Sequence, residues 1–181
     1  QLEAGAAVLF GATFVADGIE VQCDILFRHR DGTVDIYEVK SGTKVKQRYI
    51  VDLTLQAHVL KACGHELRAA FLLNINPNYE HKEGTDHAPM QLLRSTDVTA
   101  KVHKQLPHLR ARLDDLRTTC AEKAVPAVPM GSWCTRPQRC PYHGRCSAEG
   151  PRLPAYLLPE LTREQEQALL REGIREITVI D

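Results

Sequence analysis

Two acidic residues and a lysine stand where neighbouring β-strands would bring them together. Glu38 and Lys40 flank Val39, and Asp24 lies earlier in the chain with a turn, residues 30–32, in between. Residues two apart on a strand share a face, so Glu38 and Lys40 project to the same side while Val39 points away. Antiparallel pairing through the turn can bring Asp24 alongside Glu38. These side chains are therefore candidates for a single site.

The chemistry open to this group is that of a divalent cation. Two carboxylates that converge on one point are costly unless a cation lies between them. Asp24 and Glu38, with the Val39 carbonyl beside them, offer the oxygen ligands that Mg²⁺ or Mn²⁺ prefers. Lys40 could then hold or activate a water, or stabilise negative charge developing on a phosphate. The simpler alternative is an ordinary ion pair of Glu38 with Lys40 at the edge of a sheet.

A glutamine on the segment that follows extends this candidate site. Apolar residues recur every three and four positions over residues 48–63, which indicates a helix closed by Gly64. Tyr49, Asp52 and Gln56 form a stripe beside the apolar one, so Gln56 can lean over the sheet edge toward Lys40. The alternative is that Gln56 is an amide at the edge of the core.

A basic segment lies between the lysine and this helix. Lys44, Lys46 and Arg48 could neutralise several phosphates beside the proposed metal site, which would make binding salt-dependent. A solvated basic loop is the alternative. Trp133 and Tyr142 alternate with arginines further along the chain, and we expect them to pack the cysteine segment rather than to stack on bases.

Three of the six cysteines are close together in the sequence. Cys134, Cys140 and Cys146 fall within one short segment, and such a cluster in a cytosolic protein indicates metal or redox chemistry more than a disulfide framework. Three thiolates are one short of the four that usually close a zinc or iron–sulfur site. His143 could complete a Cys₃His zinc site, or a distant cysteine could complete an iron–sulfur cluster. Incidental clustering is the remaining alternative.

The elements that must position these residues follow from hydrophobic periodicity. Residues 19–27 alternate strictly, with Val21, Cys23, Ile25 and Phe27 on one face, so we expect a half-buried strand in a hairpin with residues 7–14. Further strands are expected at residues 34–39 and 67–75, followed by a polar loop over residues 77–89. The order strand, strand, strand, helix, strand predicts an α/β or α+β core with the helix on one sheet face.

The second half of the sequence is less regular. Residues 98–120 are helical in pattern, although Pro107 is expected to break or kink that helix. Thr162 and Gln165 have the spacing of a capping box for a helix over residues 163–171. Residues 174–180 are strand-like.

Composition excludes several classes of protein. The 181 residues carry 23 basic and 23 acidic side chains, so no global field draws the chain to nucleic acid or membrane. Apolar residues make up 43%, enough for a core. No apolar run is long enough to span a bilayer and no signal-peptide pattern is present, so we expect a cytoplasmic protein with no membrane partner. Phosphate-binding glycine loops and hydrolase triads are also missing.

The order of these features resembles the PD-(D/E)XK nuclease superfamily, in its RecB-like branch. The matching residues are D-I-L at residues 24–26, E-V-K-S at 38–41 and D-L-T-L-Q at 52–56. The W-C…C-P-Y…C pattern of the cysteine segment is similar to RecB-like nucleases that carry a 4Fe–4S cluster, among them CRISPR-associated adaptation nucleases. The resemblance covers roughly residues 8–146.

The resemblance implies metal-dependent hydrolysis of DNA phosphodiesters. It assigns Asp24 and Glu38 to the metal, Lys40 to the attacking water and Gln56 to support of the site. The resemblance also suggests Tyr49 as a nucleic-acid contact. In family members the corresponding tyrosine often follows the glutamine, whereas Tyr49 precedes Gln56. Family members also supply a further histidine or acid and one cluster cysteine ahead of the first strand. We therefore expect the sequence to be an excerpt, or a variant with an incomplete cluster.

Together these features predict a restriction-endonuclease-like α/β core, a mixed β-sheet flanked by helices. The core is expected over residues 1–125, a cysteine-rich module over 126–150, and a helix and strand over 151–181 that could begin a further domain. The expected function is a Mg²⁺- or Mn²⁺-dependent deoxyribonuclease in DNA repair, recombination or defence, acting on single-stranded DNA or duplex ends. The alternatives are a nuclease-fold module that binds DNA without cutting it, and a zinc-stabilised interaction domain.

Overall fold

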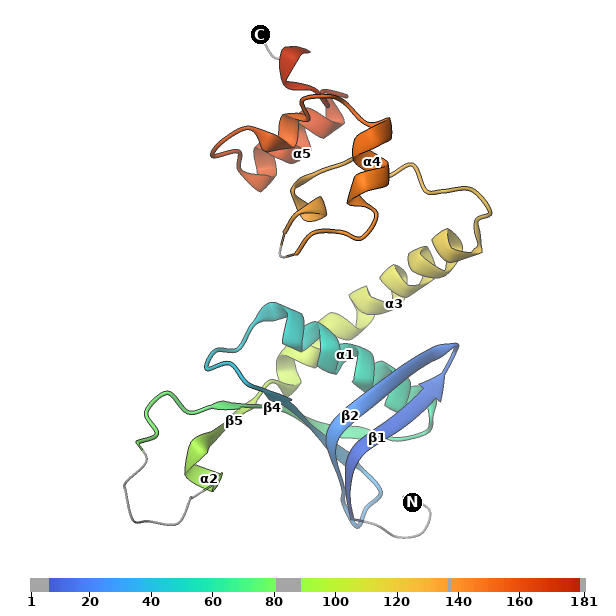
Figure 1. Ribbon diagram of the computed structural model, residues 1–181. Coiled ribbons are helices and arrows are strands. Elements are labelled where there is room, and N and C mark those ends of the chain that lie inside the picture. Colours follow the sequence, from blue (N-terminus) through green and yellow to red (C-terminus); the bar gives the residue numbers. More distant parts are fainter. Residues whose placement is uncertain (1–6, 81–88, 137, 180–181) are drawn as a thin grey trace. The chain divides into compact units, whose positions relative to one another are not determined.

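The computed structural model describes residues 7–80, 89–136 and 138–179 of the chain (Figure 1). The chain divides into two compact units, Gln1–Cys120 and Ala121–Asp181. The described residues contain no helix long and apolar enough to cross a membrane.

The first unit is built on a five-stranded mixed sheet. The strands follow one another in the order β1-β2-β3-β4-β5, and only β3 and β4 run parallel to each other. The predicted mixed α/β sheet flanked by helices is therefore confirmed. The strands are β1 Val8–Ala16, β2 Ile19–Arg28, β3 Val34–Lys40, β4 Leu67–Ile75 and β5 Leu93–Asp97.

Helix α1, Gln47–Ala62, connects the two parallel strands and covers one face of the sheet (Figure 1). A parallel pair needs such a crossover because its two strands must start at the same end. Ile50, Leu53 and Leu60 are almost fully buried in one core together with side chains of β2, β3 and β4. This packing fixes the helix on the face to which Glu38 and Lys40 belong.

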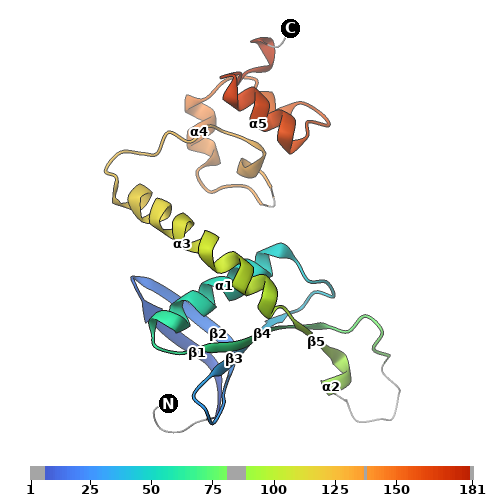
Figure 2. The same ribbon diagram turned by 180° about the vertical axis from the view of Figure 1, so that it is seen from behind.

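Helix α3, Thr99–Ala121, begins in the same core, where Val102 is buried. Figure 2 shows α1 and α3 from behind, above the sheet in that view. The helix continues through Pro107 as a single element, so Pro107 does not break it, and the alternative expectation of a kink stays a prediction. Proline removes one hydrogen bond and crowds the preceding turn, and a long helix can retain its remaining bonds on either side.

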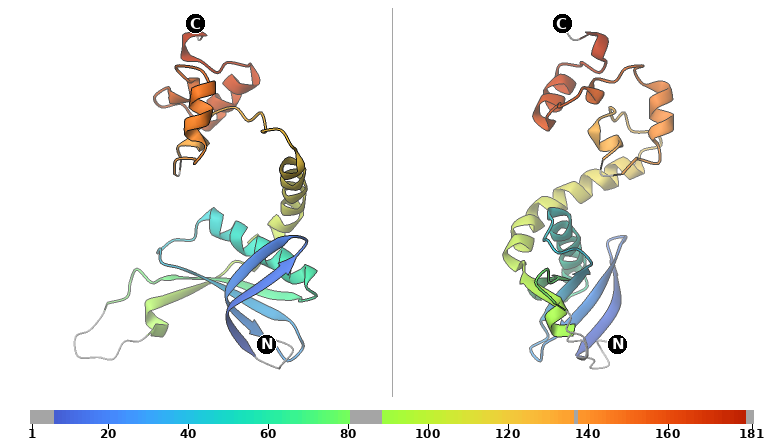
Figure 3. Two further views of the ribbon diagram at one scale, coloured as in Figure 1. Left: turned by 45° about the vertical axis from the view of Figure 1, so that its right-hand side comes forward. Right: turned by 60° about the vertical axis from the view of Figure 1, so that its left-hand side comes forward.

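The predicted alternation of β2 is wrong beyond Cys23. Cys23 and Leu26 are both fully buried, whereas Ile25 and Phe27 are only partly buried, so the buried side of the strand changes between residues 23 and 26. Gly11 of β1 lies across from this point and has a φ of +60°, a left-handed conformation that favours glycine. The hairpin of β1 and β2 is visibly twisted in Figure 3. Asp24 occupies the position at which the faces exchange.

The opposite face of the sheet carries its own polar cluster. Asp35 is 1% exposed, and Arg68 donates two hydrogen bonds to its carboxylate. His29 Nε2 lies 2.9 Å from the same carboxylate. Beside this cluster the rings of Tyr37 and Phe71 stack with centroids 4.7 Å apart. This cluster is separate from the side chains of the candidate site because alternate residues of β3 face opposite ways.

Two differences from the sequence-based expectation concern strands. Strand β5, Leu93–Asp97, was not predicted, because its sequence is mostly polar and lacks the alternation that marks a half-buried strand. The strand expected over residues 174–180 is wrong for its described part: Ile177–Val179 forms a 3₁₀ turn, and the only pairing there is a single bridge between Pro154 and Glu176.

The second unit consists of short helices and turns. Helix α4 spans His143–Glu149 and α5 spans Arg163–Arg171, with 3₁₀ turns at Ser132–Cys134 and Ala155–Leu157. The predicted capping box is confirmed, since Thr162 and Gln165 exchange both hydrogen bonds. Glu166 of α5 is 4% exposed and accepts hydrogen bonds from Ser132 N at 2.5 Å and from Ser132 Oγ at 2.6 Å. This contact ties the start of the cysteine segment to α5.

Candidate active site

Glu38 is a buried carboxylate held by two partners. The residue is 8% exposed, and its Oε1 lies 2.5 Å from Lys40 Nζ. Gln56, which is 5% exposed, donates from Nε2 to Glu38 Oε2 at 2.7 Å. The same Nε2 lies 3.2 Å from the Gln22 carbonyl. The structure therefore brings Glu38, Lys40 and Gln56 into one hydrogen-bonded group. Glu38 and Lys40 belong to β3, and Gln56 belongs to α1.

The amide of Gln56 is only half used. Its Oε1 is buried and has no hydrogen-bond partner within the part of the chain that the structure describes. Leaving a buried acceptor unpaired costs free energy of about 1–3 kcal/mol. The orphaned oxygen lies on the side chain that already contacts Glu38, so the group has unused capacity to accept a hydrogen bond or to bind a cation.

Lys40 lies between two carboxylates and an aromatic ring. Its Nζ is 2.5 Å from Glu38 Oε1 and 3.3 Å from Asp52 Oδ2, and 5.1 Å from the centre of the Tyr49 ring. Burial by itself would lower the pKa of Lys40, but the hydrogen bonds and charges of Glu38 and Asp52 outweigh it and raise that pKa. Lys40 is therefore an ammonium group at neutral pH.

Asp24 is bound to the backbone of the neighbouring strand. Its Oδ2 accepts a hydrogen bond of 2.7 Å from Val39 N. Burial, followed by the charges of Glu38 and Asp24, raises the pKa of the Cys23 thiol to about 12. Asp24 therefore contacts the backbone of Val39, the residue that follows Glu38 on β3.

Asp24 and Glu38 carry carboxylate oxygens, the ligand type that a hard divalent cation prefers. Both oxygens of Glu38 are engaged within the protein, Oε1 by Lys40 and Oε2 by Gln56. No cluster of three or more histidine, cysteine or acidic side chains suited to a metal occurs among the described residues.

The basic segment connects the carboxyl end of β3 to the first turn of α1. Lys44, Lys46 and Arg48 are all exposed. Helix α1 has no acidic residue in its first turn, so the positive end of its dipole is not neutralised there. Tyr49, in contrast, is 7% exposed, and its ring lies between Lys40 and Arg48, each 5.1 Å from the ring centre. The hydrogen bond from Arg48 to the phenol oxygen lowers the pKa of Tyr49.

Two residues that sequence reasoning missed hold this segment in place. Asn74 of β4 pairs in register with Lys40 and is fully buried, and its Nδ2 donates to the Gly42 carbonyl at 3.1 Å. Arg94 of β5 donates to the Thr43 carbonyl at 3.3 Å. A polar residue inside an otherwise apolar strand was the available signal for Asn74. No local pattern marked Arg94, because its role depends on the pairing of β4 with β5.

The cysteines of the second unit are free thiols. Cys134 is buried, while Cys140 and Cys146 are partly buried. Cys140 N donates to the Cys134 carbonyl at 2.9 Å, so these two residues are joined through the backbone. His143 Nδ1 lies 3.0 Å from Ser147 Oγ and not in a group with the thiols. The described side chains therefore do not present an assembled zinc or iron–sulfur ligand set.

Comparison with known proteins adds little to this geometry. The chain matches no family model and no curated protein. One solved structure, titled "Crystal structure of SSO0001", is similar over 60% of this chain and 53% of that chain, with 11% sequence identity and a TM-score of 0.32. The chain thus spans about half the length of the solved chain that it matches.

Proposed function

We propose that this chain is a nuclease of the RecB-like PD-(D/E)XK type, which hydrolyses DNA phosphodiester bonds with Mg²⁺ or Mn²⁺. The observation that supports this most directly is the bonded group of Glu38, Lys40 and Gln56. These three residues come from separate parts of the resemblance, two from one strand and one from the helix that follows. Asp24, the fourth residue of the pattern, contacts the backbone of Val39 between the other two.

Each side chain has a separate role in the proposed reaction. Asp24, Glu38 and the Val39 carbonyl would hold the divalent ion, which when bound supplies Lewis acidity and a water of lowered pKa. Lys40 stays protonated, so it orients the attacking water and neutralises charge on the phosphate rather than acting as a general base. Gln56 holds Glu38 Oε2 and fixes the direction of the carboxylate, as partners behind a metal ligand commonly do.

The basic segment would position the strand to be cut. Lys44, Lys46 and Arg48 are exposed at the entrance of α1, and their charges would contact phosphates on either side of the scissile one. Asn74 and Arg94 hold the backbone of this segment from the sheet. Tyr49 contacts the cations Lys40 and Arg48 with its ring rather than stacking on a base, since the residue is buried.

The cysteine segment would have a structural role in this proposal. Its thiols do not form a ligand group, so no step of the reaction is assigned to them. The contact of Glu166 with Ser132 shows how the segment can be held by protein contacts alone. Zinc or a 4Fe–4S cluster at Cys134, Cys140 and Cys146 remains a proposal that metal analysis of the purified protein tests.

The experiment that tests the function is cleavage of end-labelled single- and double-stranded DNA with Mg²⁺, Mn²⁺ or EDTA. Glu38→Gln and Lys40→Ala should each lower the cleavage rate by at least about 100-fold. The first removes a carboxylate that would hold the metal, and the second removes the ammonium group that would neutralise charge on the phosphate. Glu20→Gln is the matched control, since Glu20 is an exposed acid on β2. Wild-type rates in both site variants would refute the assignment. Binding without any metal-dependent cleavage by the wild-type chain would favour the non-cutting module.

A further inference from the structure

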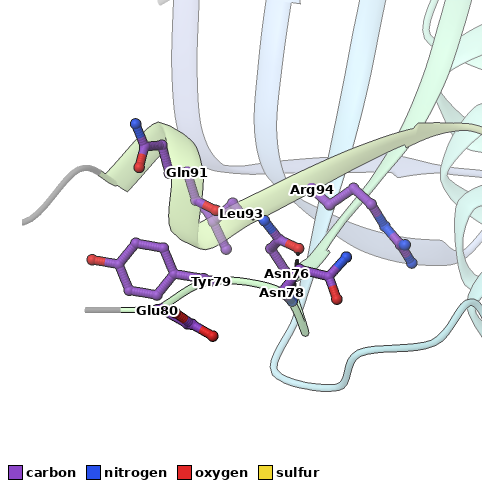
Figure 4. Close-up of a pocket in the computed structure, with 7 residues that line it drawn as sticks. All are labelled: Asn76, Asn78, Tyr79, Glu80, Gln91, Leu93 and Arg94. Carbon is purple, nitrogen blue, oxygen red and sulfur yellow. Dashed lines mark hydrogen bonds between the residues drawn. The ribbon is translucent and has the colours of Figure 1, made fainter. Parts of the chain in front are cut away.

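A polar pocket of about 430 Å³ opens at the carboxyl end of β4 (Figure 4). It lies outside the group around Glu38. The seven residues around it come from the segment after β4 and from the start of β5 with the helix before it. They are Asn76, Asn78, Tyr79, Glu80, Gln91, Leu93 and Arg94.

The lining divides into structural and available groups. Asn76 is structural, because its Nδ2 donates to the Gln91 carbonyl at 2.9 Å and its Oδ1 accepts from Asn78 N at 3.1 Å. The side-chain amides of Asn78 and Gln91 have no hydrogen-bond partner among the described residues, and both residues are exposed. The Tyr79 ring, which is half-buried, borders the same space.

These available groups match an unpaired nucleobase. Each side-chain amide presents one acceptor and two donors side by side, the pattern that pairs with the edges of bases. A tyrosine ring offers a face on which any base can stack. A base inside a duplex could not reach such a pocket, so the ligand would be a single strand or a frayed end.

The fold places this pocket beside the proposed cleavage site. Asn74 pairs in register with Lys40, and Asn76 follows two residues further along the chain. With a rise of about 3.3 Å per residue and strands about 4.8 Å apart, the backbones of Lys40 and Asn76 are roughly 8 Å apart. Arg94 joins them physically, since it lines the pocket and also holds the Thr43 carbonyl at the start of the basic segment.

We propose that this pocket binds an unpaired base of the DNA strand whose phosphodiester lies at Glu38 and Lys40. The proposal rests on the proposed function and specifies its substrate as single-stranded DNA or a frayed duplex end. The basic segment would contact the backbone, and Tyr79 with the two amides would contact the base.

Binding is measured by fluorescence anisotropy with the full chain in EDTA, so that cleavage does not interfere. The probes are a labelled single strand, the same strand with central abasic sites, and a blunt duplex. Tyr79→Ala should weaken binding of the base-bearing single strand about tenfold, and of the abasic strand less than twofold. Tyr79→Phe keeps the ring and should bind as the wild type does.

Gln91→Ala provides a second variant on another element, with Gln167→Ala as its control because Gln167 is an exposed glutamine of the second unit. Equal losses for base-bearing and abasic strands, or no loss in either variant, would overturn the proposal. Failure of the nuclease is distinguishable: base-dependent binding with no metal-dependent cleavage refutes the proposed function alone. Cleavage with unchanged binding in both variants refutes the pocket alone.

Discussion

Gln56→Leu is the substitution that best distinguishes a role of Gln56 in metal binding from a role in core packing alone. The leucine has a similar volume and the position is 5% exposed, so the change removes polar contacts with little loss of packing. The hydrogen bond of 2.7 Å to Glu38 Oε2 ends at a charged group, a kind of bond that contributes about 1.5–3 kcal/mol. The longer contact to the Gln22 carbonyl contributes about 1 kcal/mol.

One further effect works in the opposite direction. The buried Oε1 of Gln56 has no partner in the described structure, and removing it recovers about 1–3 kcal/mol. The expected net loss is therefore about 1 kcal/mol in the free energy of unfolding, or a fall in Tm of roughly 4 °C for a unit of this size. The affinity for Mn²⁺ should also fall, by about 10- to 100-fold, because Glu38 loses the group that orients it.

Two assays check these expectations on the same preparations. Thermal unfolding followed by circular dichroism gives the stability change in EDTA, and titration calorimetry with Mn²⁺ gives the affinity. Gln47→Leu is the matched control, because Gln47 is exposed on the same helix and should change neither quantity. Stability lost without any change in Mn²⁺ affinity would show that Gln56 supports the core but not a metal site, and the reasoning would be refuted.

Three other outcomes are expected. Gly11→Ala should cost about 1–2 kcal/mol by urea unfolding, because a φ of +60° strains a residue with a side chain, and an unchanged midpoint would contradict that strain. Glu166→Ala should destabilise the second unit by about 2–3 kcal/mol and Ser132→Ala by less, with limited proteolysis as the measurement, since only the first variant leaves a backbone N–H without its acceptor. Although burial opposes it, the contact with Glu38 raises the pKa of Lys40 above its usual 10.5, so its stabilising contribution is present below that pH and is lost as pH rises through the raised value. Wild type should therefore lose stability relative to Lys40→Met above about pH 10.5, and parallel pH profiles would exclude the effect.

The group around Glu38 could be anticipated from the sequence because its spacing is local. Glu38 and Lys40 share a face as a consequence of strand periodicity, and Gln56 follows on an amphipathic helix. The apolar period of the helix predicts which side packs on the sheet. Gln56 lies beside that apolar side, so its side chain was expected to reach the sheet near Lys40. The course of α1 across the sheet follows from its place in the chain, because it connects the parallel strands β3 and β4.

Features that depend on pairing between distant segments could not be anticipated. The position of Asp24 is one such feature, since the buried side of β2 changes between Cys23 and Leu26 and interrupts the alternation that its sequence predicts. Strand β5 has too little apolar character to be recognised, and it forms because β4 offers it an open edge. The pocket beside Tyr79 exists only because of that pairing.

The residue types and short-range order along the chain determined which chemistry was available: oxygen ligands, an ammonium group and a basic segment. Tertiary structure decided how those groups are held, through the buried hydrogen bond from Gln56, the backbone contact of Asp24, and the unpredicted supports Asn74 and Arg94. The physical reason is that periodicity fixes the face on which a side chain lies, whereas its partners depend on strand register and burial, which only the assembled sheet defines.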